Sequence, residues 1–60
     1  MKETKYYVVR IDKKTLVYLK DEKGKIFEFD SEKEVRAEMR EQERNYPFWF
    51  IGWKKEEVEI

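Results

Sequence analysis

Hydrophobic and polar positions change their spacing along the chain, and each spacing predicts a different element. Residues 4–11 (TKYYVVRI) are rich in β-branched and aromatic side chains, which suit a strand. Residues 16–20 (LVYLK) and 26–30 (IFEFD) are typical of a second and a third strand. The polar segment 12–15 and the glycine-containing segment 21–25 separate the three strands and predict turns. The first half of the chain is therefore predicted to form a three-stranded antiparallel meander.

A three-residue hairpin loop ending at Gly24 sets the expected register of the second and third strands. Glycine adopts the positive φ that closes such a loop with a bulge. Lys20 then faces Ile26, and one face of both strands is apolar, with Val17, Leu19, Phe27 and Phe29, where Val17 faces Phe29. If the first loop has an odd number of residues, the first strand adds Tyr7, Val9 and Ile11 to this face.

A helix is predicted to begin after Ser31. Ser31 is followed three residues later by Glu34, which is a capping box. The helix is expected to end near residue 44, because a proline follows shortly afterwards. Its apolar seam is narrow, with Val35 and Met39, so most of the helix is expected to face solvent.

Residues 48–53 (FWFIGW) are the densest apolar stretch and predict a fourth strand, with Gly52 as a bulge or kink. Residues 54–60 (KKEEVEI) either prolong this strand or pair separately. A right-handed crossover through the helix is expected to place the fourth strand parallel to strand one or three. Alternation along the strand directs Trp49, Ile51 and Trp53 to the core and leaves Phe48 and Phe50 on the opposite face.

Together these elements predict one small α+β domain over residues 1–60. The expected order is β-β-β-α-β: a three-stranded antiparallel meander, one helix packed on one face, and a fourth strand that returns to the sheet. The 60 residues are too few for two domains.

The composition argues against several chemistries. The chain has 14 Lys and Arg against 14 Asp and Glu, and it has no His and no Cys. It therefore has no disulfide, no thiolate or imidazole zinc site, and no Cys–His nucleophile. Ser31 is better explained as a helix cap than as a nucleophile. We expect no enzymatic activity, no catalytic residue, no cofactor and no metal site.

Acidic pairs and glycines add no further site. Glu28 and Asp30 lie on one strand face, but a chain of this size offers little cavity in which to shift a carboxylate pKa. The acidic residues at 21–22 and 56–59 do not have the spacing of a calcium loop. The two glycines are isolated, so no phosphate-binding motif is present and no small-molecule ligand is expected.

Binding of single-stranded nucleic acid is a further alternative. Residues 23–29 (KGKIFEF) resemble in part the first signature of an RNA-recognition motif, but Lys25, Ile26 and Glu28 depart from it. Residues 1–30 have eight basic and six acidic side chains, which is a poor electrostatic footprint for a polyanion. A basic row on the helix, Arg36, Arg40 and Arg44, is explained by salt bridges to nearby glutamates.

No apolar run reaches the length of a membrane span, and the N-terminal residues do not resemble a signal peptide. The expected location is therefore cytoplasmic, with no membrane partner. The absence of cysteine is compatible with a reducing compartment.

The remaining candidate is an aromatic surface formed by Tyr6, Tyr18, Phe48 and Phe50 on the sheet face opposite the core. The leading hypothesis is a non-enzymatic interaction module that binds a protein partner, or a second copy of itself, through this face. One alternative is a designed or idealised scaffold without a natural biochemical function, which fits the capping box and the Lys/Glu-rich surface. The same composition also fits a thermostable protein.

Overall fold

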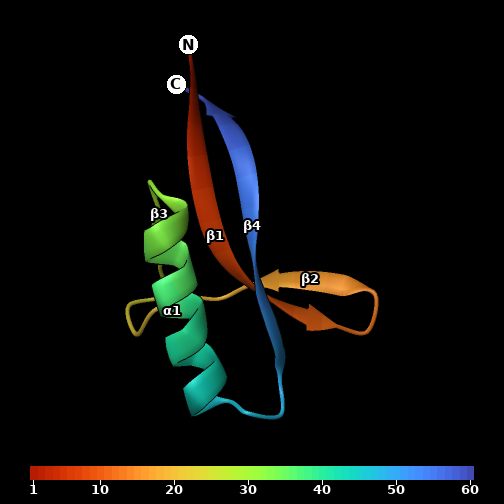
Figure 1. Cartoon of the computed structure of the whole chain (residues 1–60). Helices are drawn as coiled ribbons and strands as arrows, with labels where there is room; N and C mark the ends of the chain where they lie inside the picture. Colours follow the sequence, from red (N-terminus) through yellow and green to blue (C-terminus); the bar gives the residue numbers. More distant parts are fainter.

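The chain forms one helix and one four-stranded antiparallel sheet. In the computed structural model, which describes all 60 residues, the elements follow in the order β1 (Lys2–Asp12), β2 (Thr15–Tyr18), β3 (Glu28–Phe29), α1 (Glu32–Asn45) and β4 (Phe50–Glu59) (Figure 1). The predicted α+β class and the predicted β-β-β-α-β order are confirmed.

β1 is the central strand, and β4 pairs with it along almost its whole length. The antiparallel register runs from Lys2 opposite Glu59 to Ile11 opposite Phe50. β3 is also antiparallel to β1, and Tyr6 pairs with β3 and with β4 at once. β3 and β4 therefore run in the same direction on opposite edges of β1. The crossover was expected to place the fourth strand parallel to strand one or three. β4 is parallel to β3 and antiparallel to β1, which lies between them.

β2 and β3 both lie along the other edge of β1, like one strand interrupted by an excursion. β2 pairs with residues 9–12 of β1, whereas β3 pairs with Tyr6 and Tyr7. Residues 20–26 between them form a small hairpin in which Lys20 is bridged to Ile26, as predicted. Gly24 has a φ of 83° and closes its turn.

The register predicted beyond this small hairpin is wrong. Val17 pairs with Arg10 of β1, and Phe29 pairs with Tyr6, so Val17 and Phe29 do not face each other. The reason is that β2 and β3 each pair with β1 and not with each other, so the predicted three-stranded meander is not formed. The turn between β1 and β2 has only two residues between Asp12 and Thr15. Lys13 closes it with a φ of 58°, a left-handed conformation that non-glycine residues seldom adopt.

The even length of this first turn also changes which residues share a face. Tyr18 lies opposite Val9, and Leu16 lies opposite Ile11. The condition of an odd loop is therefore not met, and Tyr7, Val9 and Ile11 do not share a face with Val17. A shift of one residue in the register moves every side chain of a strand to the other face.

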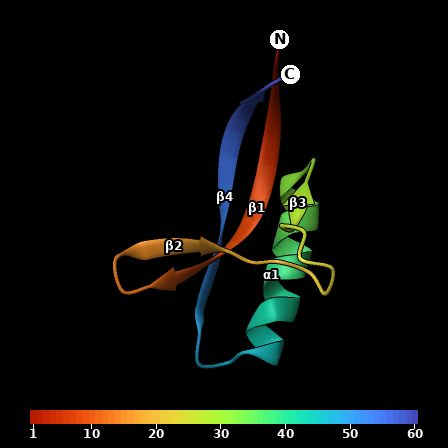
Figure 2. The ribbon, with the colours of Figure 1, turned by 180° about the vertical axis from the view of Figure 1, so that it is seen from behind.

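β4 continues through residues 54–59, so the first of the two alternatives for this segment is confirmed. The predicted bulge at Gly52 is wrong, because the β1–β4 register passes through the pair Val9–Gly52 without an extra residue. The change in apolar spacing after Trp53 has another cause. The β1–β4 ribbon extends past the end of α1 (Figures 1 and 2), where the helix covers neither face and apolar spacing is less constrained.

The helix begins as the sequence predicts. The Ser31 side-chain oxygen accepts a hydrogen bond from the Glu34 N–H at 3.3 Å, and Ser31 itself is extended, with φ −140° and ψ 153°. At the other end, the Tyr46 N–H donates to the Gln42 carbonyl at 2.8 Å. Val35 is the one fully buried helix residue, which agrees with the predicted narrow seam.

The core is very small. Tyr7, Val8, Val9 and Val35 are the four buried residues, and only Val8 and Val35 are completely inaccessible to solvent. Every other apolar side chain is at least partly exposed. The aromatic side chains therefore contribute little buried apolar area, since Tyr7 is the one aromatic residue among the four buried residues.

Candidate interaction surface

The register divides the sheet into two faces, because residues directly opposite each other on neighbouring strands point to the same side. The helix-covered face carries Tyr6 and Val8 of β1, with Trp53 opposite Val8. The Arg36 guanidinium of α1 lies 5.9 Å from the centre of the Trp53 ring, which places the helix on this side. The other side is called the open face here.

The open face consists of alternate residues from the four strands, with Glu28 of β3 directly opposite Tyr7. β1 contributes Lys5, Tyr7, Val9 and Ile11, while β4 contributes Phe50, Gly52, Lys54 and Glu56. β2 adds Leu16 and Tyr18. Most of the helix lies on the other side, and Glu43 near its end borders a hollow that Ile11 and Phe50 also line.

The structure brings together two of the four residues of the predicted aromatic surface. Phe48 is 93% exposed and Phe50 is 77% exposed, and both line one shallow hollow of about 370 Å³. Tyr18 of β2 also lies on the open face, but it is opposite Val9 of β1 and not opposite Ile11. Tyr6 lies on the helix-covered face, where its ring centre is 5.9 Å from that of Trp53. Placing Tyr6 with the other three was therefore wrong, because its position in β1 has the parity of Val8.

Ile11 and Leu16 belong to the surface although the sequence reasoning did not include them. Leu16, Ile11 and Phe50 are directly opposite one another on β2, β1 and β4, so they form one row across the sheet. Ile11 is 47% exposed and Leu16 is 46% exposed. The four residues Ile11, Leu16, Phe48 and Phe50 are called the apolar surface below. No local sequence signal indicates this row, because it depends on the two-residue turn that Lys13 closes with a positive φ.

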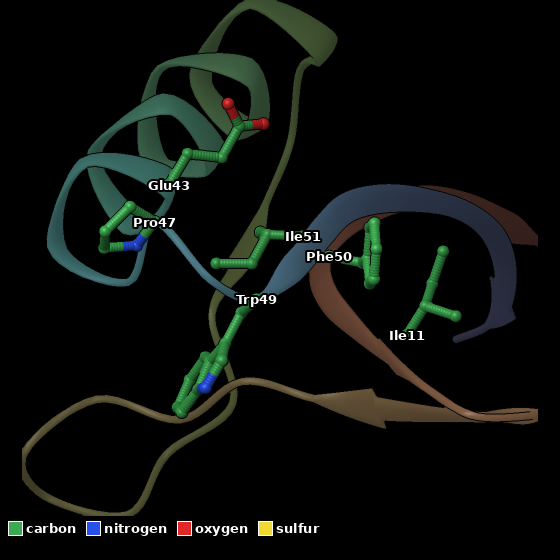
Figure 3. Close-up of a pocket in the computed structure, with 6 residues that line it drawn as sticks. All are labelled: Ile11, Glu43, Pro47, Trp49, Phe50 and Ile51. Atoms are coloured by element: carbon green, nitrogen blue, oxygen red, sulfur yellow. The ribbon is translucent and has the colours of Figure 1, made fainter.

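A hollow of about 450 Å³ adjoins this surface. Figure 3 shows its lining, which consists of Ile11, Glu43, Pro47, Trp49, Phe50 and Ile51. The Phe50 ring lies beside Ile11, whereas Ile51 points towards Pro47 (Figure 3). The hollow contains a single ionisable group, the carboxylate of Glu43, and no second acid or base for proton transfer.

The segment between α1 and β4 is held in place by a stack of three side chains. The rings of Tyr46 and Trp49 are parallel to within 7°, with their centres 4.1 Å apart. The Arg10 guanidinium lies 4.4 Å from the centre of the Trp49 ring, and it also approaches Asp12 at 3.5 Å. Trp49 was expected in the core but is 38% exposed, because it packs on this stack. Phe48 lies between Tyr46 and Trp49 in this segment, and its side chain is exposed to solvent.

Farther along the open face, Tyr18 reaches across β1 to β4. Its hydroxyl donates a hydrogen bond to Glu56 and accepts one from the Lys54 amine at 3.4 Å. The ring therefore crosses Val9, which is paired with Tyr18 on one side and is only 3% exposed. Tyr18 has a structural role in covering the core.

Tyr7 continues this network. Its ring centre lies 5.3 Å from that of Tyr18, and its hydroxyl donates to Glu28 at 3.1 Å. Burial raises the pKa of Tyr7, and the hydrogen bond to Glu28 raises it further. The hydrogen bond to Glu56 is the main reason why the pKa of Tyr18 is also raised. Both phenols therefore remain protonated donors at neutral pH.

Lys5 completes the polar half of the open face. Its amine is 2.6 Å from Asp30, 3.5 Å from Glu3 and 3.9 Å from Glu28. The hydrogen bond to Asp30 is the largest of the interactions that raise the pKa of Lys5. The open face thus has a polar half, in which charges are paired, and an apolar half without polar partners.

Two of the three arginines of the basic row on the helix form ion pairs within it, whereas Arg40 has no carboxylate within 4 Å. Arg36 lies 3.4 Å from Glu32, as predicted, and Arg44 lies 3.3 Å from Glu41. No group of three acidic side chains is arranged to hold a metal ion. The single helix is too short and too polar to cross a membrane.

Comparisons with known proteins add no relative. No family model, no curated protein and no solved structure matches the chain.

Proposed function

We propose that this protein is a non-enzymatic interaction module, which binds another polypeptide through the apolar surface. The observation that carries the proposal is the exposure of Phe48 and Phe50, at 93% and 77%, beside the half-exposed Ile11 and Leu16. A contiguous exposed apolar patch on a small protein is typical of a protein-binding surface. Aromatic side chains are also the residues that contribute most of the energy at such interfaces.

The position of Phe48 supports a binding role more than a packing role. The stack of Arg10, Trp49 and Tyr46 restrains the segment that carries it. A ring held outward in this way loses little conformational freedom when a partner covers it. The rim is charged, with Lys13, Lys14 and Asp12 all exposed at the β1–β2 turn. An apolar centre with a polar rim is the common arrangement of protein interfaces.

The same geometry favours a protein partner over a nucleic acid or a substrate. Lys5 and Lys54 are the cations nearest the open-face tyrosines, and both have carboxylates within 4 Å. The cations beside these two tyrosines are therefore paired and not free to hold phosphates. The raised pKa values of Tyr7 and Tyr18 oppose formation of a phenolate nucleophile. We extend the proposal to a cytoplasmic location, which the absence of cysteine supports.

A binding assay with two variants tests the proposal. The wild-type protein is expected to bind an apolar fluorescent dye and to select peptides with aromatic or aliphatic residues from a random library. The double variant Phe48→Ser/Phe50→Ser is expected to lose at least about tenfold in affinity for both, which corresponds to about 1.4 kcal/mol.

The matched control is Ile60→Ser. Ile60 is 74% exposed, close to the exposure of Phe50, but it lies at the opposite end of the β1–β4 ribbon. This control should bind as the wild type does. Equal binding by all three proteins, or no binding by the wild type at a concentration at which it is monomeric, would reject the apolar surface as an interaction site and leave a scaffold without a binding function.

A further inference from the structure

We propose that the partner of the apolar surface is a second copy of this chain, packed face to face about a two-fold axis. This inference rests on the proposed function and names its partner. Three observations support it: the surface area that the chain exposes, the distribution of its charges, and the side chains along the free edge of β4.

The exposed area is larger than that of an average folded monomer of this mass. The chain has 7.6 kDa and an accessible surface of 5055 Å². Folded monomers of this mass expose about 4300 Å², from the scaling of area with mass. The excess is therefore about 750 Å². A standard protein interface buries about 800 Å² on each partner, so one isologous contact would remove the excess.

A large part of this excess lies in the apolar surface. With about 200 Å² for a whole phenylalanine side chain, the exposed fractions of Phe48 and Phe50 amount to about 340 Å². Ile11 and Leu16 add further area in the same row. The row crosses three strands, with Leu16, Ile11 and Phe50 directly opposite one another, so an identical row of a second copy can pack against it.

The charges do not oppose this contact. The formal net charge is zero, so two copies have no long-range repulsion. The rim contains both signs, because Lys13 and Lys14 lie beside Asp12, whose side chain is 56% exposed. A two-fold contact can therefore place basic groups of one copy near acidic groups of the other.

The free edge of β4 is a less favourable place for self-association. In an antiparallel pair with two-fold symmetry, the residue on the axis faces its own copy. Near the middle of β4 this residue is Lys54, Lys55, Glu56 or Glu57, so like charges would lie directly opposite each other. Charged side chains on an edge strand protect it against such pairing. The apolar surface, and not the edge of β4, is therefore assigned as the dimer contact.

Sedimentation equilibrium over a wide range of protein concentration tests this inference. The wild-type protein is expected to shift from the mass of one chain to the mass of two as its concentration rises. Phe50→Ser should raise the dissociation constant of the dimer at least about tenfold, and Ile60→Ser should leave it unchanged. The mass of one chain at every concentration would overturn the inference, even if the dye and the peptides still bind and the proposed function stands.

Single cysteines distinguish the face from the edge, because the natural chain has none. Ile11 lies in the middle of the apolar row, so Ile11→Cys is expected to form an intermolecular disulfide under mild oxidation. Lys55→Cys, at the edge of β4, is expected to remain reduced at the same protein concentration. A disulfide through residue 55 and none through residue 11 would overturn the assigned contact, and the edge would then be the interface.

Discussion

The two glycines of the chain have different roles, because only one of them needs the conformational freedom of glycine. Gly24 has a φ of 83° and closes the excursion between β2 and β3. Gly52 lies in regular strand pairing opposite Val9, and a Cβ added to it would meet no atom within 4 Å. Glycine in a strand interior costs stability because the unfolded chain is more flexible.

Exchanging each glycine for alanine should therefore change stability in opposite directions. We expect Gly52→Ala to raise the free energy of unfolding by about 0.5–1 kcal/mol. We expect Gly24→Ala to lower it by about 1 kcal/mol, because alanine disfavours positive φ. Denaturant unfolding of both variants measures the difference. A loss of stability in Gly52→Ala would mean that the open space above residue 52 is needed by a neighbouring side chain.

The tyrosines of the open face make stability depend on alkaline pH. The folded-state pKa values of Tyr7, Tyr18 and Lys5 are all raised above their ordinary values. A raised folded pKa contributes stability below the unfolded pKa, which is about 10 for tyrosine. This contribution is lost as the pH rises through the folded pKa. The free energy of unfolding should thus fall above pH of about 10.

Tyr18→Phe isolates one of these groups. The variant removes the hydroxyl that donates to Glu56 but keeps the ring that crosses Val9. Its free energy of unfolding should fall less steeply with rising pH than that of the wild type. Absorbance of tyrosinate should show one fewer phenol that titrates above the ordinary pKa of tyrosine. Identical pH profiles for the two proteins would show that Tyr18 titrates at its ordinary pKa.

At the scale of elements, α1 depends on a single cap and a single buried residue. Ser31 satisfies the Glu34 N–H, and Val35 is the only helix residue without solvent exposure. Ser31→Ala is expected to lower the free energy of unfolding by about 1 kcal/mol, while Ser31→Asp should retain most of the stability. Thermal unfolding followed by helical circular dichroism checks both variants. Equal losses in the two variants would indicate that the serine hydroxyl itself is required and that an aspartate carboxylate cannot replace it as the N-cap.

The element types could be predicted from the sequence because their signals are local. The N-cap at Ser31 and the glycine at position 24 both occur where the sequence indicated them. The register of β2 on β1 could not be predicted in the same way. It depends on Lys13 adopting positive φ, and this conformation is rare for lysine. The physical cause is the pairing that the two strands gain on either side of the turn.

The candidate site was predictable only in part for the same reason. Phe48 and Phe50 were identified because an apolar run of six residues must expose some of its members on a strand. Ile11 and Leu16 join them only through the register that Lys13 sets. The structure places Tyr6 with Trp53, since parity along β1 assigns it to the helix-covered face.

At the scale of the whole molecule, the fold leaves much of its apolar surface unused. Four residues are buried, while the accessible surface is 5055 Å². The polar half of the open face is covered by the paired network of Tyr7, Tyr18 and Lys5. The apolar half has no such cover, and this division is the basis of the proposed interaction.

The unfolding midpoint of Phe48→Ser/Phe50→Ser, measured beside the wild type at low and at high protein concentration, tests this account most directly. At low concentration the free energies of unfolding of the two proteins should differ by no more than about 0.5 kcal/mol, as expected for surface positions. At high concentration the wild-type midpoint should rise and the variant midpoint should stay constant, because only the wild type gains stability from association. A loss of about 3 kcal/mol or more in the variant at low concentration would place both rings in the core and contradict the account.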